Sequence, residues 1–423
     1  MRVLYSLLIT LATPFVLLYF ALRGFRDPAY FSRWAERFGF ILSSGNKGGI
    51  LVHAASVGEV NAASPLIKAL LKTYPDLPVT VTTLTPTGSE LVKRELGDSV
   101  FHCYIPIDLP GAVSRFLGRL HPRIIIVIET EIWPNLYLQA QRLNIPLVMA
   151  NARISERSTN RYRFLSGFVA EILQTVSWVG AQSAADAERL IKSGADSQNV
   201  CITGNLKFDL SIPASLEEKG AALRARWTQQ RSVLVAGSTH EADESVVIPA
   251  FVELLKTIPD ALLILVPRHP ERFARSIQAV KTTGLVTELR SQGEFCSQQA
   301  QCFVIDSMGE LMTYYACADV AFVGGSMGEQ GGHNALEPAA LGKPVLLGPN
   351  MDNAREIASQ LLECNAARCV SNQKDFEQEV QQIMTDAALR NRMGQAGRAL
   401  VEKNKGALAL TLNAVEKMLR SHP

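Results

Sequence analysis

From about residue 48 onward, short apolar runs rich in β-branched residues alternate with longer stretches of helical pattern. Strands that are covered by helices on both faces read as continuous apolar runs, so this pattern predicts parallel sheets made of right-handed βαβ units. In the first half of the chain the predicted strands are 50–54, 79–83, 100–106, 124–129, 146–151, 178–182 and 200–205. In the second half they are 232–238, 261–267, 302–307, 320–325 and 344–348.

A polar stretch without strand pattern, residues 209–231, separates the two series of strands. Because 423 residues are too many for one hydrophobic core, we expect two doubly wound α/β domains, at 40–210 and 211–423, after an N-terminal segment at 1–39. The last helical stretch, 406–420, could pack on either domain, and the sequence leaves this open. Ligands of such sheets bind at the carboxyl ends of strands, where the strand order reverses.

The N-terminal segment is the part of the chain that does not read as soluble. Residues 3–22 carry no charge and lie between Arg2 and Arg23, and as a helix they would span about 30 Å, the thickness of a bilayer core. A signal peptide would have a shorter apolar stretch and a small-residue cleavage site, whereas here arginine and aromatic residues follow at 26–40. We therefore expect a single-pass anchor with an interfacial collar and the rest of the chain in the cytoplasm. A soluble protein with a buried N-terminal helix is the alternative.

Composition excludes several functional classes. The net charge of +2 is too close to neutral for a typical nucleic-acid binder. The seven cysteines form no C-x-x-C pair, which favours reduced thiols over a metal site. The chain also lacks the P-loop pattern, a clean G-x-G-x-x-G after the first strand and a G-x-S-x-G elbow. We therefore expect neither a metal nor a cofactor.

The turn after the first predicted strand carries a candidate catalytic carboxylate. In the stretch HAASVGE, Ser56 and Glu59 have the spacing of a helix capping box, in which Glu59 would accept a hydrogen bond from the backbone N–H of Ser56. Glu59 would also lie at the carboxyl edge of the sheet, where a carboxylate can take a proton from a substrate hydroxyl. The two roles compete for the same oxygens, and the spacing alone favours the cap.

Strand ends in the second half carry candidate anion-binding groups. A glycine-rich loop at 324–332 precedes Asn334 and Glu337, where a helix N-terminus could bind an anion and Glu337 could accept hydrogen bonds from a ribose. A flexible loop capped by Asn334 is the alternative. Arg268 follows another strand and is well shaped for a phosphate or a cytosine edge, although a surface ion pair would place an arginine there equally well.

Several long blocks, taken together, resemble the Kdo transferases of Gram-negative bacteria, which are membrane-anchored glycosyltransferases of the GT-B fold. They run in order over nearly the whole chain: HAASVGE, TVTTLTPTGSE, ETEIWPN, NARIS, GNLKFD, STHEADE, LVPRHPERF, MGEL and GGSMGEQGGHNALEPAALGKPVLLGP. The resemblance implies transfer of 3-deoxy-D-manno-oct-2-ulosonic acid (Kdo) from CMP-Kdo to a lipid A precursor, with inversion, on the cytoplasmic face of the inner membrane.

The resemblance also assigns residues. It makes Glu59 the general base, and Ser56, Glu131 and Lys207 weaker candidates for contacts with the acceptor or the Kdo carboxylate. The positions that would hold CMP are Pro267, Arg268, Met308, Gly309, Glu310, Asn334, Ala335, Leu336 and Glu337. Another GT-B activity, such as a UDP-sugar transferase or epimerase, and a non-enzymatic membrane scaffold are the competing hypotheses. The number of Kdo units transferred is left open.

Overall fold

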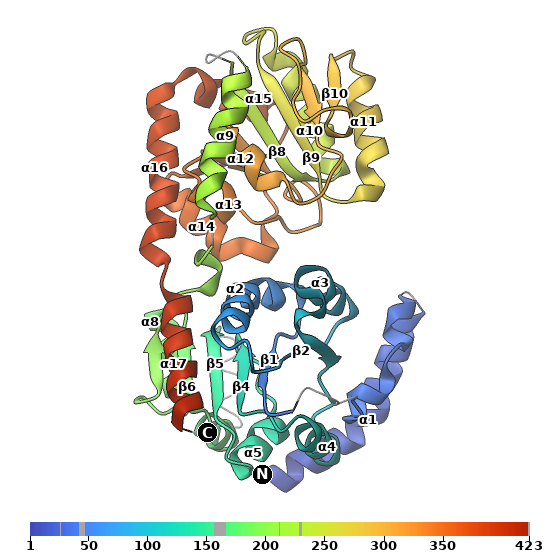
Figure 1. The fold of residues 1–423 in the computed structure, drawn as a ribbon, viewed down its shortest axis with the longest axis vertical. Coiled ribbons are helices and arrows are strands. Elements are labelled where there is room, and N and C mark those ends of the chain that lie inside the picture. Colours follow the sequence, from blue (N-terminus) through green and yellow to red (C-terminus); the bar gives the residue numbers. More distant parts are fainter. Residues whose placement is uncertain (26, 42–46, 156–165, 211, 228–230, 422–423) are drawn as a thin grey trace. The chain divides into compact units, whose positions relative to one another are not determined.

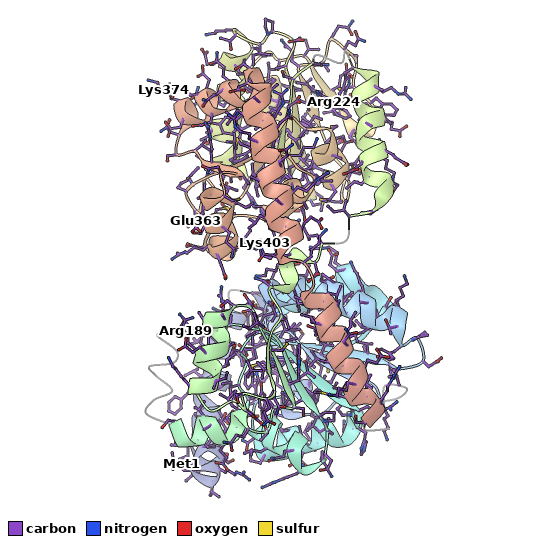
Figure 2. All side chains as sticks on the ribbon, turned by 90° about the vertical axis from the view of Figure 1, so that its left-hand side faces the viewer. Met1, Arg189, Arg224, Glu363, Lys374 and Lys403 are labelled. Atoms are coloured by element: carbon purple, nitrogen blue, oxygen red, sulfur yellow. The ribbon has the colours of Figure 1, made fainter. Side chains whose placement is uncertain are left out.

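The computed structural model describes residues 1–25, 27–41, 47–155, 166–210, 212–227 and 231–421. The chain divides into two units, Met1–Asp209 with Asn404–Pro423, and Leu210–Lys403 (Figure 1). Figure 2 labels Lys403, at which the second unit ends. Each unit is built around one parallel sheet.

In the described part of the first unit, seven parallel strands form a sheet in the order β3-β2-β1-β4-β5-β6-β7. The chain moves outward from β1 through β2 to β3 and then returns to the other side of β1 at β4, so the strand order reverses between β1 and β4. The loops after β1 and β4 leave the same edge of the sheet in opposite directions, so the carboxyl ends of these two strands are the expected ligand position. The strands are β1 (Ile50–His53), β2 (Val79–Thr83), β3 (Phe101–Tyr104), β4 (Ile124–Ile128), β5 (Leu147–Ala152), β6 (Trp178–Ala181) and β7 (Val200–Ile202).

Helices cover both faces of this sheet, which is why its strands are apolar throughout. Alternate strand residues contribute to two cores: Leu51 and Ile125 pack with α4, α5, α7 and α8, whereas Val52 and Ile126 pack with α2, α3 and α17. The helices are α1 (Arg2–Gly24), α2 (Val57–Thr73), α3 (Pro86–Leu96), α4 (Pro110–Leu120), α5 (Pro134–Arg142), α7 (Ser166–Leu173), α8 (Ala184–Lys192) and α17 (Ala407–Ser421). Short 3-10 turns are η1 (Pro28–Phe31), η2 (Trp34–Phe38), η3 (Gly97–Ser99) and η5 (Leu206–Phe208).

The second unit repeats the plan, with a parallel sheet in the order β10-β11-β9-β8-β12-β13-β14 and its reversal between β8 and β12. The sequence did not predict β10 and β14, because each edge strand has only three residues and no fully apolar run. The strands are β8 (Val233–Thr239), β9 (Leu262–Pro267), β10 (Thr287–Leu289), β11 (Cys302–Val304), β12 (Val320–Val323), β13 (Val345–Leu347) and β14 (Ala367–Cys369).

The helices of the second unit are likewise split between the two sheet faces. One core includes residues of α10 and α15, and the other includes residues of α9 and α12. The helices are α9 (Ala214–Arg226), α10 (Glu241–Leu254), α11 (Phe273–Lys281), α12 (Leu311–Cys317), α13 (Leu336–Ala340), α14 (Arg355–Glu363), α15 (Gln373–Thr385) and α16 (Ala387–Asn404). Short 3-10 turns are η6 (Pro270–Arg272), η7 (Arg290–Gln292) and η8 (Asp352–Ala354).

The C-terminal helix α17 belongs to the first unit, a question that the sequence left open. Figure 1 shows α17, in red, beside strands of the first unit, and Val415 is fully buried in the core that α2 also lines. The carboxylate of Asp209 accepts hydrogen bonds from the backbone N–H groups of Gly406, at 2.8 Å, and Leu408, at 2.9 Å. These hydrogen bonds join the start of α17 to Asp209, the last residue of the main segment of the first unit.

We expect Val415→Ala to lower the free energy of unfolding of the first unit by about 2 kcal/mol, because it removes buried methyl groups and leaves a cavity. Asn413→Ala, at an exposed position of the same helix, is the control and should change it little. Three of the four tryptophans, Trp34, Trp133 and Trp178, lie in the first unit, so tryptophan fluorescence during urea unfolding measures the effect. Equal midpoints for the two variants would contradict the packing of α17.

Candidate active site

Glu59 lies in the first turn of α2, directly after β1. Its side chain is nearly buried, since the residue is 8% exposed. The backbone N–H of Ala55 donates to Glu59 Oε2 at 2.5 Å, and the hydroxyl of Ser56 donates to Glu59 Oε1 at 3.1 Å. The capping-box prediction was therefore wrong in detail: Glu59 accepts from Ala55 rather than from the N–H of Ser56, and the Ser56 side chain caps no helix N–H. Both groups instead orient the carboxylate.

The surroundings of Glu59 favour the protonated carboxyl more than water does. Burial, together with the negative charges of Glu131 and Glu129, raises the pKa of Glu59 to about 7, and this outweighs the opposite effect of the hydrogen bonds from Ala55 and Ser56. A carboxyl with a pKa near 7 is well matched to proton transfer at neutral pH. The position therefore suits a general base.

The two neighbouring carboxylates come from the loop after β4, across the reversal of the sheet. Glu129 follows the last residue of β4 and has a φ of 61°, a left-handed conformation that is uncommon for residues other than glycine. Burial raises the pKa of Glu131 as well. Because β4 pairs with β1, the three carboxylates share the carboxyl edge at the switch point. The sequence pointed to Glu59 and Glu131; Glu129, the first residue of the ETE triplet, was missed.

At the same carboxyl edge of the first sheet, amide side chains connect the ends of β5 and β6 to the loop after β7. Asn151, also left-handed with a φ of 59°, accepts a hydrogen bond from the N–H of Leu206 through Oδ1 at 2.9 Å. The side chain of Gln182 donates to the carbonyl of Asn151 at 2.9 Å and accepts from Asn205 at 3.1 Å. These bonds hold the turn η5, which carries Lys207 and packs against α2.

In the second unit, Asp243 holds the glycine-rich loop at the carboxyl edge. This fully buried residue lies in the first turn of α10 and accepts four backbone hydrogen bonds. The donors are the N–H groups of His240 at 2.8 Å, Gly325 at 2.7 Å, Ser326 at 3.3 Å and Met327 at 3.0 Å. The start of α10 and the loop after β12 are thereby joined across the switch point. An acidic residue three positions after a helix cap was the signal that could have revealed Asp243.

Three histidines cluster beside this loop. His240 and His333 approach to 3.0 Å between their Nε2 atoms with nearly parallel rings, and the ring of His269 lies edge-on to His240. Burial, followed by the charge of Arg268, lowers the pKa of His333 to about 3, so this histidine is neutral at physiological pH. Among the described residues, no group of three or more His, Cys, Asp or Glu side chains is arranged to hold a metal ion.

Arg268 and Glu337, both predicted to contact a nucleotide, act on each other electrostatically. Arg268 follows the last residue of β9, Pro267, and is partly buried. Burial raises the pKa of Glu337 to about 6, and the hydrogen bond from Asn334, at 3.1 Å, and the charge of Arg268 oppose this rise. α13 begins at Leu336 with Ala335 as its cap residue, so Asn334 is not the cap of this helix, as the alternative interpretation of the sequence had it. Its side chain instead accepts from the N–H of Leu336 and donates to Glu337.

The third predicted segment, Met308 to Glu310, follows β11 on the same edge of the same sheet. Met308 is 51% exposed, and Gly309 has a φ of 87°, which favours glycine. Burial raises the pKa of Glu310, but hydrogen bonds from the Ser307 hydroxyl, at 2.6 Å, and from Arg290 Nε, at 2.9 Å, lower it overall. The three predicted segments follow β9, β11 and β12 on one edge of this sheet; β12 lies at the reversal, β9 is next to β8, and β11 is one strand further out.

The sequence matches two family models. Residues 32–210 match the model described as 3-deoxy-D-manno-octulosonic-acid transferase (kdotransferase), and residues 232–400 match glycosyl transferases group 1. The chain is 40% identical over 421 residues to the 3-deoxy-D-manno-octulosonic acid transferase of Haemophilus influenzae, which covers 99% of each chain.

Two solved structures are also similar. The crystal structure of the C-terminal CMP-Kdo binding domain of WaaA from Acinetobacter baumannii is 31% identical, covers 44% of this chain and 99% of that chain, and has a TM-score of 0.42. UDP-GlcNAc 2-epimerase from Neisseria meningitidis, bound to UDP-GlcNAc, is 15% identical, covers 87% of this chain and 100% of that chain, and has a TM-score of 0.56. The latter shows the fold alone. The two parallel sheets and the matching glycosyltransferase models confirm the predicted GT-B fold class.

We expect Asp243→Asn to destabilise the second unit by about 3 kcal/mol, because the amide loses a charge-assisted acceptor and turns an NH₂ group toward backbone N–H donors. Glu294→Gln, at an exposed position, is the control. Trp227 is buried in the second unit and reports its unfolding by fluorescence once the other three tryptophans are replaced by phenylalanine. Equal midpoints in urea would show that the four hydrogen bonds do not hold the loop.

Proposed function

The chain belongs to the 3-deoxy-D-manno-octulosonic acid transferase family, and from this we propose that it moves Kdo from CMP-Kdo to a lipid A precursor in lipopolysaccharide core biosynthesis, with inversion at the anomeric carbon. The first unit supplies the base and the second holds the donor. The observation that carries this proposal is the buried Glu59 carboxylate at the switch point of the first sheet, whose pKa burial and two neighbouring carboxylates raise to about 7.

On the donor side, the proposed reaction releases CMP, whose phosphate carries negative charge as the glycosidic bond breaks. Arg268 follows β9 at the carboxyl edge of the second sheet, and a guanidinium suits phosphate better than an ammonium does. Glu337 would accept hydrogen bonds from the ribose hydroxyls, with Asn334 fixing its orientation at 3.1 Å. The remaining proposed CMP contacts are Pro267, Met308, Gly309, Glu310, Ala335 and Leu336.

On the acceptor side, Glu59 would remove the proton of a sugar hydroxyl as the oxygen attacks the face of Kdo opposite to CMP. Such a displacement inverts the anomeric centre, because the nucleophile and the leaving group occupy opposite faces. Ser56 donates to Glu59 and would therefore orient the base rather than contact the acceptor. Lys207, on a turn that packs against α2, remains a candidate for the Kdo carboxylate or an acceptor phosphate, and Glu131 for the acceptor.

An enzyme that acts on a lipid acceptor has to reach the membrane surface, and α1 could hold it there. Of the helices that the structure describes, α1 is long and apolar enough to cross a membrane, by length and composition. We propose that α1 holds the enzyme at the cytoplasmic face of the inner membrane, where a lipid A precursor would reach the first unit. The single span expected from the sequence stays a prediction, since a helix lying in the membrane interface would hold the enzyme on the same side.

We expect Glu59→Gln to lower the rate of Kdo transfer by about 10²- to 10⁴-fold, the usual contribution of a general base, because the amide cannot accept the proton. The assay uses CMP-Kdo and a tetraacylated lipid A precursor, with products counted by mass spectrometry. CMP should still raise the melting temperature of this variant, and Arg268→Ala should abolish that rise.

Glu95→Gln, an exposed carboxyl of the first unit, is the matched control and should transfer normally. Full activity of Glu59→Gln would refute the base, whereas a scaffold without catalytic activity predicts no Kdo transfer by either the variant or the unmodified protein. Thermal protection by UDP rather than by CMP would instead favour a UDP-sugar enzyme of the same fold.

A further inference from the structure

The helix α1, blue in Figure 1, has two different faces along its whole length. Its less exposed positions recur every three or four residues, at Tyr5, Ile9, Thr13, Val16, Phe20 and Gly24. Its other face is apolar and exposed by 49% to 73% at Leu4, Leu7, Leu11, Phe15, Leu18 and Leu22. Spacings of three and four residues place each set on one side of a helix.

Polar groups near the N-terminal end of α1 bind the first unit. The hydroxyl of Tyr5 donates to Asp108 Oδ2 at 2.9 Å, and that of Ser6 donates to Asn135 Oδ1 at 2.9 Å. Arg2 forms an ion pair with Glu171 of α7. Asp108 is itself fixed, because it also accepts the backbone N–H groups at the start of α5. The N-terminal end of α1 is therefore bonded to residues of α5 and α7, and to a loop residue that α5 fixes.

The C-terminal end of α1 rests on the same unit. Phe20 packs against Tyr30 and Trp34, and the guanidinium of Arg37 lies over the Phe20 ring at 4.3 Å. The carbonyl of Arg37 accepts the backbone N–H of Ile107 at 2.8 Å. Ile107 precedes Asp108, so neighbouring residues of one loop connect to both ends of the helix.

This arrangement is hard to reconcile with a transmembrane orientation. Tyr5 and Phe20 are separated by about 22 Å of helix axis, most of the thickness of a bilayer core. If α1 spanned the membrane, Tyr5 would lie near the far side, beyond the reach of Asp108. We propose that α1 does not span the bilayer but lies along its cytoplasmic surface, with the Leu4-to-Leu22 face in the acyl-chain boundary and the Tyr5-to-Gly24 face on the first unit.

The chemistry around α1 fits lipid as the occupant of the exposed face. Three further exposed aromatic side chains follow the helix in sequence: Phe25, Phe31 and Phe40, which are 82%, 46% and 48% exposed. Arg115 and Arg119 of α4 lie over the Phe40 ring at 4.5 and 5.4 Å, where their charges can meet anionic headgroups. Apolar side chains bordered by arginines are typical of interfacial membrane attachment. The inference rests on the proposed membrane function and replaces the single span by a surface anchor.

A disulfide between α1 and the first unit tests this orientation. Ser6→Cys with Asn135→Cys, in a chain whose exposed Cys201 and Cys369 are changed to serine, should form an intramolecular disulfide in inner-membrane vesicles under mild oxidation. We expect at least half of the protein to be cross-linked, with Kdo transfer within threefold of the uncross-linked enzyme. Leu11→Cys with Asn135→Cys is the matched control and should not cross-link, because Leu11 is on the opposite face.

A membrane-impermeant maleimide supplies the second readout. In the surface orientation, Arg2→Cys is labelled from the cytoplasmic side in inverted vesicles, as Ser32→Cys should be in either orientation. Labelling of Arg2→Cys only from the periplasmic side, with no disulfide between positions 6 and 135, would overturn the proposal. A disulfide between the Leu11→Cys residues of two copies would also overturn it, because a second chain and not lipid would then cover the face. If the enzyme without substitutions shows no Kdo transfer, the proposed function is refuted, but the orientation of α1 is not.

Discussion

The proposed chemistry depends on the burial of the Glu59 carboxylate in the first turn of α2, directly after β1. Removing a charged carboxylate from water costs free energy, and the hydrogen bonds from Ala55 and Ser56 offset only part of that cost for Glu59. Glu131 and Glu129, brought in from the loop after β4, add repulsion. The sheet enforces this, because β1 and β4 are parallel neighbours and the loops that follow them therefore lie at one edge. High proton affinity at Glu59 is thus a consequence of the fold.

In the second unit, two buried carboxylates have enough hydrogen-bond donors around them, unlike Glu59 in the first unit. Asp243 accepts four backbone hydrogen bonds, and Glu244 accepts from Thr239, Ser276 and Arg272. These acids are satisfied and serve to fix loops. At this edge the positive charge of Arg268 opposes the rise in the pKa of Glu337 and adds to the burial that keeps His333 neutral. The first unit therefore suits proton transfer and the second suits binding of an anionic group.

The sequence pattern predicted the central strands of both sheets, because a strand covered on both faces must be apolar throughout. It missed β10 and β14, whose three residues at a sheet edge leave no such pattern. It could not place α17, since an amphipathic helix fits many partners, and only the contacts with Asp209 and α2 decide between them.

Side-chain roles were harder to predict than strands. The Ser56–Glu59 spacing suggested a capping box, but the direction of each hydrogen bond depends on the backbone of the turn, where Ala55 turned out to be the donor. Glu129 and Asp243 were missed because their importance comes from residues that are distant in sequence: Glu59 for the former, and Gly325 to Met327 for the latter. The assignment of the CMP contacts stays a prediction.

The pH dependence of Kdo transfer tests the central claim most directly. If Glu59 is the base, kcat/KM for the lipid acceptor should rise with pH through a midpoint near 7, because the carboxyl must lose its proton before it can accept one from the acceptor. Glu131→Gln should shift this midpoint to lower pH by removing a negative charge, whereas Glu95→Gln should leave it unchanged. A midpoint near the ordinary carboxyl value of 4.5, or one that Glu131→Gln does not move, would contradict the account.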